Sequence, residues 1–147
     1  DRAGGGTLCP AEMVGDMTRR NISSGSKYEP FIGFSRAVRI GNIIAVGGSA
    51  PIGPDGKNVG GDDPAAQTRA CVEVIRVALE KVGARLEDVI RTRVFFTRQS
   101  DWEAIGRAHG EAFGDIRPAS TMAVVKALID DAWLVEMEAD AVIEERG

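Results

Sequence analysis

Five stretches of the chain have the alternation or the composition of β-strands. A period of two places every second side chain on one face, so that face can lie in a core. The first two stretches are separated only by Gly41 and Asn42, a dipeptide typical of tight turns, and together they predict a hairpin. The pattern leaves open a sixth strand near residues 21–23. The five predicted strands are residues 34–40, 43–46, 89–97, 122–127 and 134–143.

Helical spacing of apolar residues predicts a first helix from Pro64 to a stop at Gly83. Asp62 or Asp63 can cap its first turn, and proline is favoured at the first helical position. The side assigned to the core contains Ala70, Val74, Val77, Ala78 and Val82.

A second helix is predicted to end near Phe113, and Ser100 with Glu103 is expected to form its capping box. His109, the single histidine of the chain, falls on the apolar side of this helix. That position favours a packed, hydrogen-bonded interior residue over a catalyst, and no second histidine offers a metal site or a triad. The predicted apolar stripe contains Trp102, Ile105, His109, Ala112 and Phe113.

The order of these elements predicts an α+β fold, namely a mixed sheet of five to six strands. Two helices cannot cover both faces of such a sheet, so both are expected on one face. The other face mixes acidic and apolar residues and needs a cover of its own. Packing against further copies of the same chain would provide one, which predicts a homo-oligomer.

Composition sets the domain count. The chain has 147 residues, of which 44% are hydrophobic and 27% charged, as in one globular domain with a core. Residues 1–16 are glycine-rich and follow neither period, so they are expected to be a disordered extension or a cloning remnant. Residues 17–147 are expected to form the single domain.

The net charge of the chain limits the partners that it is expected to bind. A formal charge of −4 gives no basic footprint for a phosphate backbone, so nucleic acid is not an expected partner. No run approaches the ~18 apolar residues of a membrane span, and the first residues lack the apolar stretch of a secretory signal, so neither feature is expected. Cys9 and Cys71 form neither a disulfide framework nor a metal-ligand cluster. A cytoplasmic protein that binds small molecules and protein partners is expected.

Three acids share one face of the last predicted strand. In "LVEMEADAVI", Glu136, Glu138 and Asp140 alternate with apolar residues. Alternate residues lie roughly 7 Å apart, so their carboxylates repel unless they are solvated, paired or partly protonated. The acids can line a wet surface, pair with Arg91 or Arg93 across the sheet, or serve a function.

The runs "GFSRAVRIGNIIAVGGSAP", "RTRVFFT" and "FGDIRPASTMAVVKALIDDAWLVEMEADAVI" resemble the Rid family of reactive intermediate deaminases, also called the YjgF family. The resemblance implies a chorismate-mutase-like fold and a homotrimer whose sheets form a central barrel. It also implies three clefts between subunits that hold a small-molecule ligand. Well-understood members use no cofactor and hydrolyse enamines or imines, such as 2-aminoacrylate, to a keto acid and ammonia.

The resemblance assigns the catalytic role to Glu136, because family members carry a catalytic glutamate in a matching "E-hydrophobic-E-A" segment. Imine hydrolysis needs a group that delivers water to the imine carbon and assists the departing nitrogen. A carboxylate in a partly dry cleft can do both, since burial raises its pKa.

One departure from the family falls at the substrate end. Active imine deaminases of the family carry an arginine directly after "PA", where its planar fork binds the substrate carboxylate. Ser120 stands there, and a hydroxyl offers one weaker, uncharged donor. Arg117 lies three residues earlier, either near the cleft or as a surface arginine before a turn proline.

Other positions complete the predicted substrate site. Phe34 replaces a family tyrosine that borders the cleft, and Arg36 is either a source of positive charge for the cleft or a solvated strand residue. Backbone groups from Ser120 to Met122 are expected to hold the substrate, and Gly106 stands where some members have asparagine. Two functions follow: a Rid-type hydrolase, favoured by Glu136, or a non-catalytic binding trimer, favoured by the absent arginine.

Overall fold

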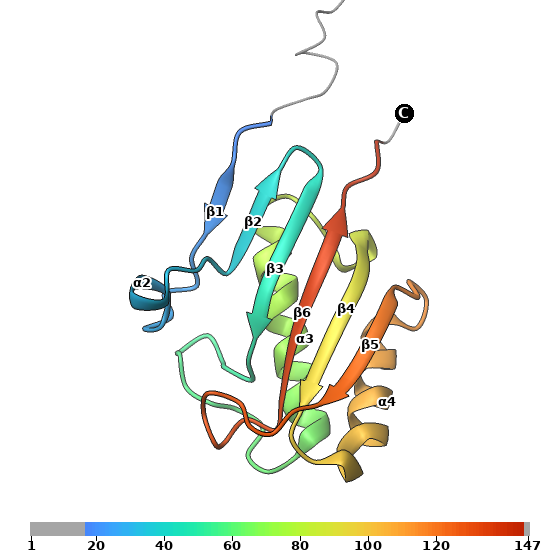
Figure 1. Cartoon of the computed structure of the whole chain (residues 1–147). Coiled ribbons are helices and arrows are strands. Elements are labelled where there is room, and N and C mark those ends of the chain that lie inside the picture. Colours follow the sequence, from blue (N-terminus) through green and yellow to red (C-terminus); the bar gives the residue numbers. More distant parts are fainter. Residues whose placement is uncertain (1–16, 146–147) are drawn as a thin grey trace, which may run out of the picture.

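The computed structural model describes residues 17–145, so the expectation for residues 1–16 lies outside the described part. These residues form one six-stranded sheet in the order β1-β2-β3-β6-β4-β5, with helices packed against it (Figure 1). The elements in chain order are β1 (Arg20–Ile22), α2 (Glu29–Ile32), β2 (Ala37–Ile40), β3 (Ile43–Ser49), α3 (Pro64–Glu80), η1 (Leu86–Asp88), β4 (Val89–Phe96), η2 (Gln99–Asp101), α4 (Trp102–Phe113), β5 (Ala119–Val124) and β6 (Val135–Val142).

The sheet is mixed. β5 runs parallel to β4, and the other neighbouring strands pair antiparallel. A parallel pair needs a crossover connection, which α4 supplies between β4 and β5. β6, the last strand in sequence, lies in the middle between β3 and β4.

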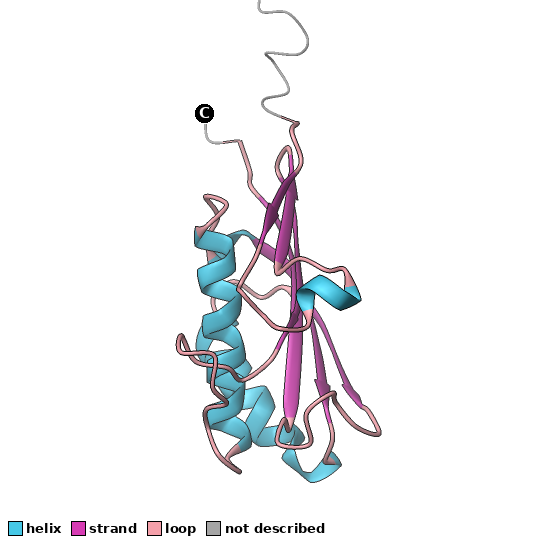
Figure 2. Cartoon of the chain, turned by 90° about the vertical axis from the view of Figure 1, so that its left-hand side faces the viewer, coloured by secondary structure: helices cyan, strands magenta, loops and turns pink. Residues whose placement is uncertain are grey.

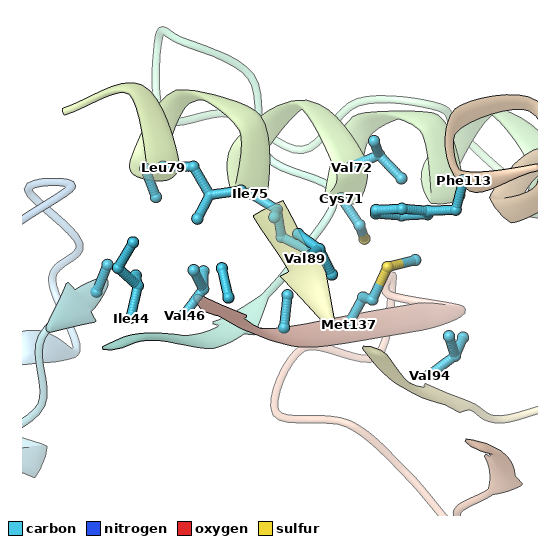
Figure 3. Packing of buried hydrophobic residues seen from close by; sticks show 14 of the residues in the cluster. Ile44, Val46, Cys71, Val72, Ile75, Leu79, Val89, Val94, Phe113 and Met137 are labelled. Carbon is cyan, nitrogen blue, oxygen red and sulfur yellow. The ribbon is translucent and has the colours of Figure 1, made fainter. Parts of the chain in front are cut away.

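The two long helices cover one face of the sheet, as expected (Figure 2). α3 begins where Asp63 accepts hydrogen bonds from the backbone of Ala65 and Ala66, at 3.0 and 3.3 Å. Figure 3 shows the core between α3, the end of α4 and the strands. Its fully buried members include Ile44, Cys71, Ile75, Leu79, Val135 and Met137.

The predicted core side of α3 is wrong in part. Ala78 and Val82 are buried, but Val77 is 37% exposed. A neighbouring row of residues faces the sheet instead. α3 is apolar on more than one side, so two rows satisfy the helical period. The row that reaches the core is Thr68, Cys71, Val72, Ile75 and Leu79.

The predicted capping box of α4 is also wrong. A 3₁₀ turn, η2, precedes the helix and takes up Ser100, so Asp101 becomes the N-cap without a side-chain cap bond. The acidic side chains at the start of the helix bind arginines instead. Arg98 donates to Asp101 at 2.7 Å, and Arg107 donates to Glu103 at 2.7 Å. Trp102, predicted to be in the apolar stripe, is 53% exposed.

The strands lie where the alternation predicts them, but several begin or end at residues other than the predicted ones. β1 confirms the sixth strand that the pattern left open. β2 starts three residues later than predicted, since the short helix α2 ends at Gly33 with φ 84° and residues 34–36 follow it as a connection. β5 starts three residues earlier than predicted, at Ala119.

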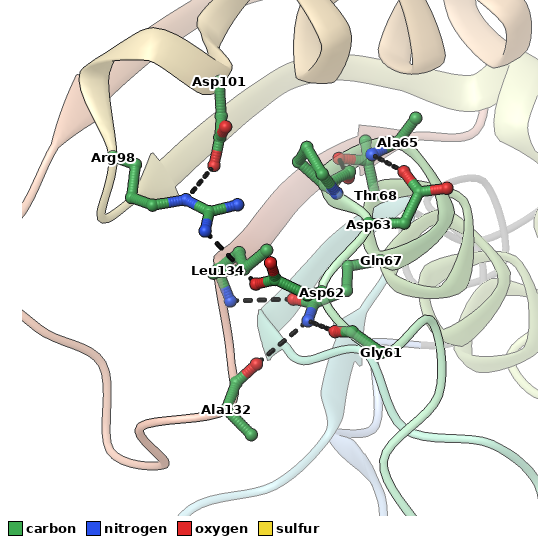
Figure 4. A network of polar contacts seen from close by, with 11 residues as sticks. Gly61, Asp62, Asp63, Ala65, Gln67, Thr68, Arg98, Asp101, Ala132 and Leu134 are labelled. Atoms are coloured by element: carbon green, nitrogen blue, oxygen red, sulfur yellow. Dashed lines mark hydrogen bonds and ion pairs between the residues drawn. The ribbon is translucent and has the colours of Figure 1, made fainter.

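A buried glutamine fixes the segment that leads into β6. The Gln67 side chain donates to the carbonyls of Gly61, at 2.7 Å, and Ala132, at 2.9 Å, and accepts from the Leu134 amide at 2.7 Å (Figure 4). Gly60 fits next to Gln67 only without a side chain, because its φ is 91° and a Cβ would lie 2.9 Å from the backbone nitrogen of Gln67.

Replacing Gln67 with leucine is expected to destabilise the protein. The change leaves two carbonyls and one amide without their partner, and one buried unsatisfied group costs about 1 to 3 kcal/mol. We expect a loss of about 3 kcal/mol in the free energy of unfolding, measured by urea denaturation at one protein concentration. The same substitution at the exposed Gln99 is the control and should change little. Equal effects at both positions would contradict this role of Gln67.

Candidate functional site

The three acids of β6 have different partners. Their side chains point to the face of the sheet away from α3 and α4, because Val135, Met137 and the alanines between them are buried on the helix side. Nη1 of Arg93 on β4 donates to Glu138 and to Asp140, each at 3.2 Å. Pairing across the sheet is therefore confirmed for Glu138 and Asp140. Glu136 has no ion pair with any described residue.

Glu136 is half-buried. Its register partner on β4 is Phe95. Burial raises the pKa of the Glu136 carboxyl; the positive charge of Arg36 opposes this rise in pKa, and the negative charge of Glu138 adds to it. A carboxyl of this kind holds its proton to a higher pH than a solvated glutamate does.

A glycine pair lets the neighbouring strand approach this carboxyl. The register of β3 against β6 shifts between Val46 and Ser49, where Gly47 and Gly48 lie. A Cβ on Gly48 would lie 2.7 Å from Oε1 of Glu136, so no side chain fits there without moving the carboxyl. Only glycine at this pair allows the backbone of β3 to come so close to the carboxyl.

Arg36 lies under the same irregularity and is only 7% exposed. Its Nη1 donates to the carbonyl of Gly48, to the Ser49 hydroxyl at 3.0 Å and to the Gly47 carbonyl at 3.5 Å. Its Cζ lies 5.8 Å from the ring centre of Phe34. Arg36 is thus no solvated strand residue; it is buried close enough to Glu136 for each charge to affect the other's pKa.

Ser120 lies on the opposite face. It pairs in register with Thr92, and the Thr92 hydroxyl donates to Oγ of Ser120 at 2.8 Å. The same hydroxyl oxygen lies 2.8 Å from Nε2 of His109, so three side chains form one hydrogen-bonded row. Burial lowers the pKa of His109, whose ring stacks on Phe113 at 4.7 Å. His109 is therefore packed and hydrogen-bonded, as predicted, but its partners Thr92 and Ser120 could not be identified from the local pattern.

The remaining predicted residues lie near this second face or outside both groups. Met122, two residues beyond Ser120, is 37% exposed, and its sulfur would be 3.9 Å from a Cβ on Gly106. Arg117 is exposed in the turn before Pro118 with φ 56°, and its side chain bonds to no described residue. One chain therefore separates the predicted site into two groups, Glu136 with Arg36 and Phe34, and Ser120 with Met122.

Two surface hollows lie away from both groups. They have volumes of about 300 and 250 Å³, and Arg85 and Glu87, just before the start of β4, contribute to the walls of both. Within residues 17–145, no group of three or more His, Cys, Asp or Glu side chains is arranged to hold a metal ion. No helix in that part of the chain is long and apolar enough to cross a membrane.

Residues 25–143 match the family described as Endoribonuclease L-PSP. The chain belongs to this family. Rv2704 of Mycobacterium tuberculosis, described as a member of the YjgF/YER057c/UK114 family, has a crystal structure similar to this chain. The two are 46% identical with a TM-score of 0.78, over 86% of this chain and 100% of that one.

Two further relatives connect this L-PSP/YjgF family to the resemblance found in the sequence. YyfA of Yersinia pestis, from the conserved Rid protein family, is 26% identical with a TM-score of 0.76, over 86% of this chain and 100% of that one. The 3-aminoacrylate deaminase RutC of Acinetobacter baylyi is 32% identical over 105 residues, 71% of this chain and 83% of that protein. The Rid resemblance and the α+β YjgF fold are thus confirmed.

Replacing Glu136 with glutamine is expected to stabilise the protein near pH 7. Because the folded chain binds this proton more tightly than the unfolded chain, Glu136 adds stability below the usual glutamate pKa, and that contribution is lost as the pH rises through the raised pKa. The gain of Glu136→Gln over the original chain should therefore shrink near pH 4. Urea denaturation at both pH values measures it. Glu138→Gln, which removes a partner of Arg93, should show no such gain; an equal gain in both variants would contradict the assignment.

Proposed function

We propose that this chain is a hydrolase of reactive enamines or imines, of the 2-aminoacrylate type, and that it releases a keto acid and ammonia. The observation that carries the proposal is the state of Glu136. It is the one acid of its row without an ion pair to a described residue, and burial raises its pKa. The similarity to RutC, named a 3-aminoacrylate deaminase, supports this substrate class.

The chemistry uses one proton donor and one water molecule. Protonated Glu136 gives its proton to the enamine carbon, which converts the C=C–N unit to a C=N imine. The carboxylate then takes a proton from water as the water oxygen bonds to the imine carbon. Glu136 next returns this proton to the nitrogen, and ammonia leaves as the C–N bond breaks; the hydroxyl group loses its proton to the Glu136 carboxylate and becomes the carbonyl. A carboxyl with a raised pKa suits both directions of proton transfer, because it populates both forms nearer neutral pH.

The assembly we propose is a homotrimer with its ligand in clefts between subunits. The Glu136 group and the Ser120 group lie on opposite faces of one sheet, so a cleft lined by both needs two chains. Apolar side chains on the open face support packing against other copies: Ile43 is 66% exposed and Ile90 is 54% exposed. Family membership supports the same arrangement.

Light scattering should give a particle of about 47 kDa in solution, which corresponds to three chains of 15.6 kDa. Burial of the open face favours association at micromolar concentration. A charge placed on that face, Ile43→Asp, should weaken the assembly. Lys57→Asp, which changes a solvent-exposed loop residue, is the control and should leave the mass unchanged. A stable monomer of the original chain would remove the cleft between subunits.

Glu136→Gln should lower imine hydrolysis roughly a hundredfold or more, in line with the contribution of general acid-base catalysis. The glutamine keeps the shape of the side chain and cannot exchange the proton. Activity is measured as keto acid formed when a pyridoxal phosphate enzyme releases 2-aminoacrylate in the same vessel. Glu138→Gln is the matched control, two residues away on the same face, and should cost little. If Glu136→Gln keeps full turnover, the hydrolase proposal fails.

A second candidate is a ligand-binding trimer without turnover. It is favoured by Ser120, which stands in the place of the family arginine and is hydrogen-bonded to Thr92. This candidate predicts saturable binding of small carboxylic acids with no keto acid formed from any imine supplied. RNA cleavage has less support, since the formal charge of −4 opposes binding to a phosphate backbone.

A further inference from the structure

One edge of the buried Arg36 guanidinium has no protein partner. Nη1 makes every hydrogen bond of this side chain, to the two glycine carbonyls and the Ser49 hydroxyl. Nε is buried and bonds to nothing among the described residues, and Nη2 forms no hydrogen bond with them either. Nε and Nη2 lie on the same side of the planar group. A side chain that is 7% exposed therefore presents two adjacent donors without an acceptor.

Such an edge matches one kind of ligand. A buried polar atom without a partner is costly, so an orphaned donor pair needs an explanation. Parallel N–H groups of arginine bind the two oxygens of a carboxylate at once. The anchoring of Nη1 holds the guanidinium in place, which reduces the side-chain entropy lost when an anion binds.

Neither acid near Arg36 occupies the edge. Oε2 of Glu29 already accepts from the Ser26 amide at 2.8 Å and from the hydroxyl and amide of Ser24 at 3.0 and 3.2 Å. Glu136 affects the charge of Arg36 through space but forms no ion pair with it in the described structure. The local positive charge is thus partly balanced, while the two donors stay open.

The guanidinium of Arg36 lies next to glycine backbone beside Glu136. Gly47 and Gly48 carry no side chains, and an added Cβ on Gly47 would lie 3.3 Å from the Ser35 carbonyl oxygen and 3.8 Å from Nη2 of Arg36. Gly47, Gly48 and Glu136 are all partly exposed, so the guanidinium lies just below the surface at this point. The ring of Phe34 borders the group at 5.8 Å from Cζ.

We propose that the Nε–Nη2 edge of Arg36 binds the carboxylate of the substrate and holds the adjacent C=N carbon near Glu136. The inference rests on the proposed hydrolase function and narrows its substrates to imines and enamines that carry a carboxylate next to the reacting carbon. Arg36, which lies close to Glu136, then supplies the positive charge that Ser120 lacks. Arg36 acts as a specificity-determining residue.

Binding can be tested in the original protein without turnover. In protein labelled with ¹⁵N-arginine, the Nε–H resonance of Arg36 is identified by its loss in Arg36→Lys. Pyruvate, which has a carboxylate next to its carbonyl, should shift this resonance with saturation. Pyruvamide, its uncharged counterpart, should not. An equal response to both compounds, or no response to pyruvate, would overturn the proposal.

Kinetics test the same contact. Arg36→Lys keeps the charge and loses the two-pronged geometry, and should raise KM for a 2-imino acid about 10- to 100-fold, the worth of one charge-assisted hydrogen bond. KM for an imine without a carboxylate should not change. Arg69→Gln, on the outer side of α3, is the charge control. An unchanged KM for the 2-imino acid in folded Arg36→Lys would overturn the contact.

The two proposals fail in different ways. A pyruvate-specific shift of Arg36 without turnover refutes the hydrolase and leaves the carboxylate site standing. Turnover that depends on Glu136, without that shift, refutes the site and leaves the hydrolase. If Glu136→Gln by itself moves the Arg36 resonance as far as pyruvate does in the original protein, the edge belongs to an internal Arg36–Glu136 pair and the carboxylate site is refuted.

Discussion

The position of every candidate catalytic group depends on the register of β6. Four of its side chains, Val135, Met137, Ala139 and Ala141, are fully buried against the helices. A slip by one residue would place the acids in the core and the apolar row in water, so the hydrophobic effect admits one register. Paired strands on both sides and the hydrogen bonds of Gln67 before the strand hold it there.

That register places three carboxylates on one face, and the chain treats them in two ways. Arg93 lies opposite Glu138 and stabilises it together with Asp140. At the level of Glu136 the same neighbouring strand offers Phe95, which cannot pair with a charge. On the other side the β3 irregularity brings backbone in place of a side chain. Glu136 therefore differs from Glu138 and Asp140 because neither neighbouring strand places a cationic side chain opposite it.

Much of this follows from the sequence. Alternation located β3, β4 and β6, and with it the face on which Glu136, Glu138 and Asp140 lie. The core side of α3 was wrong because its apolar residues form two rows, and only packing against the sheet selects one. The capping box failed because a local pattern does not exclude a 3₁₀ turn before the helix. The short helix α2 has four residues, too few to show a period.

The arrangement of the site was beyond sequence reasoning for a different reason. Whether Ser120 and Glu136 lie on the same face depends on the register of β5 against β4 and of β4 against β6. The local sequence determines neither register. The burial of Arg36 likewise depends on the β3 irregularity, whose carbonyls turn toward Nη1.

Keeping Arg36 and Glu136 partly dry opposes stability, since burial disfavours the charged form of each. A fold under selection for stability alone would join them in an ion pair or replace them with apolar residues. The chain instead anchors the arginine by one nitrogen and leaves the acid unpaired. Buried charged groups with shifted pKa values and without an ion pair cluster at functional sites, and the carboxylate ligand proposed above would complete the hydrogen bonds that folding leaves unmade.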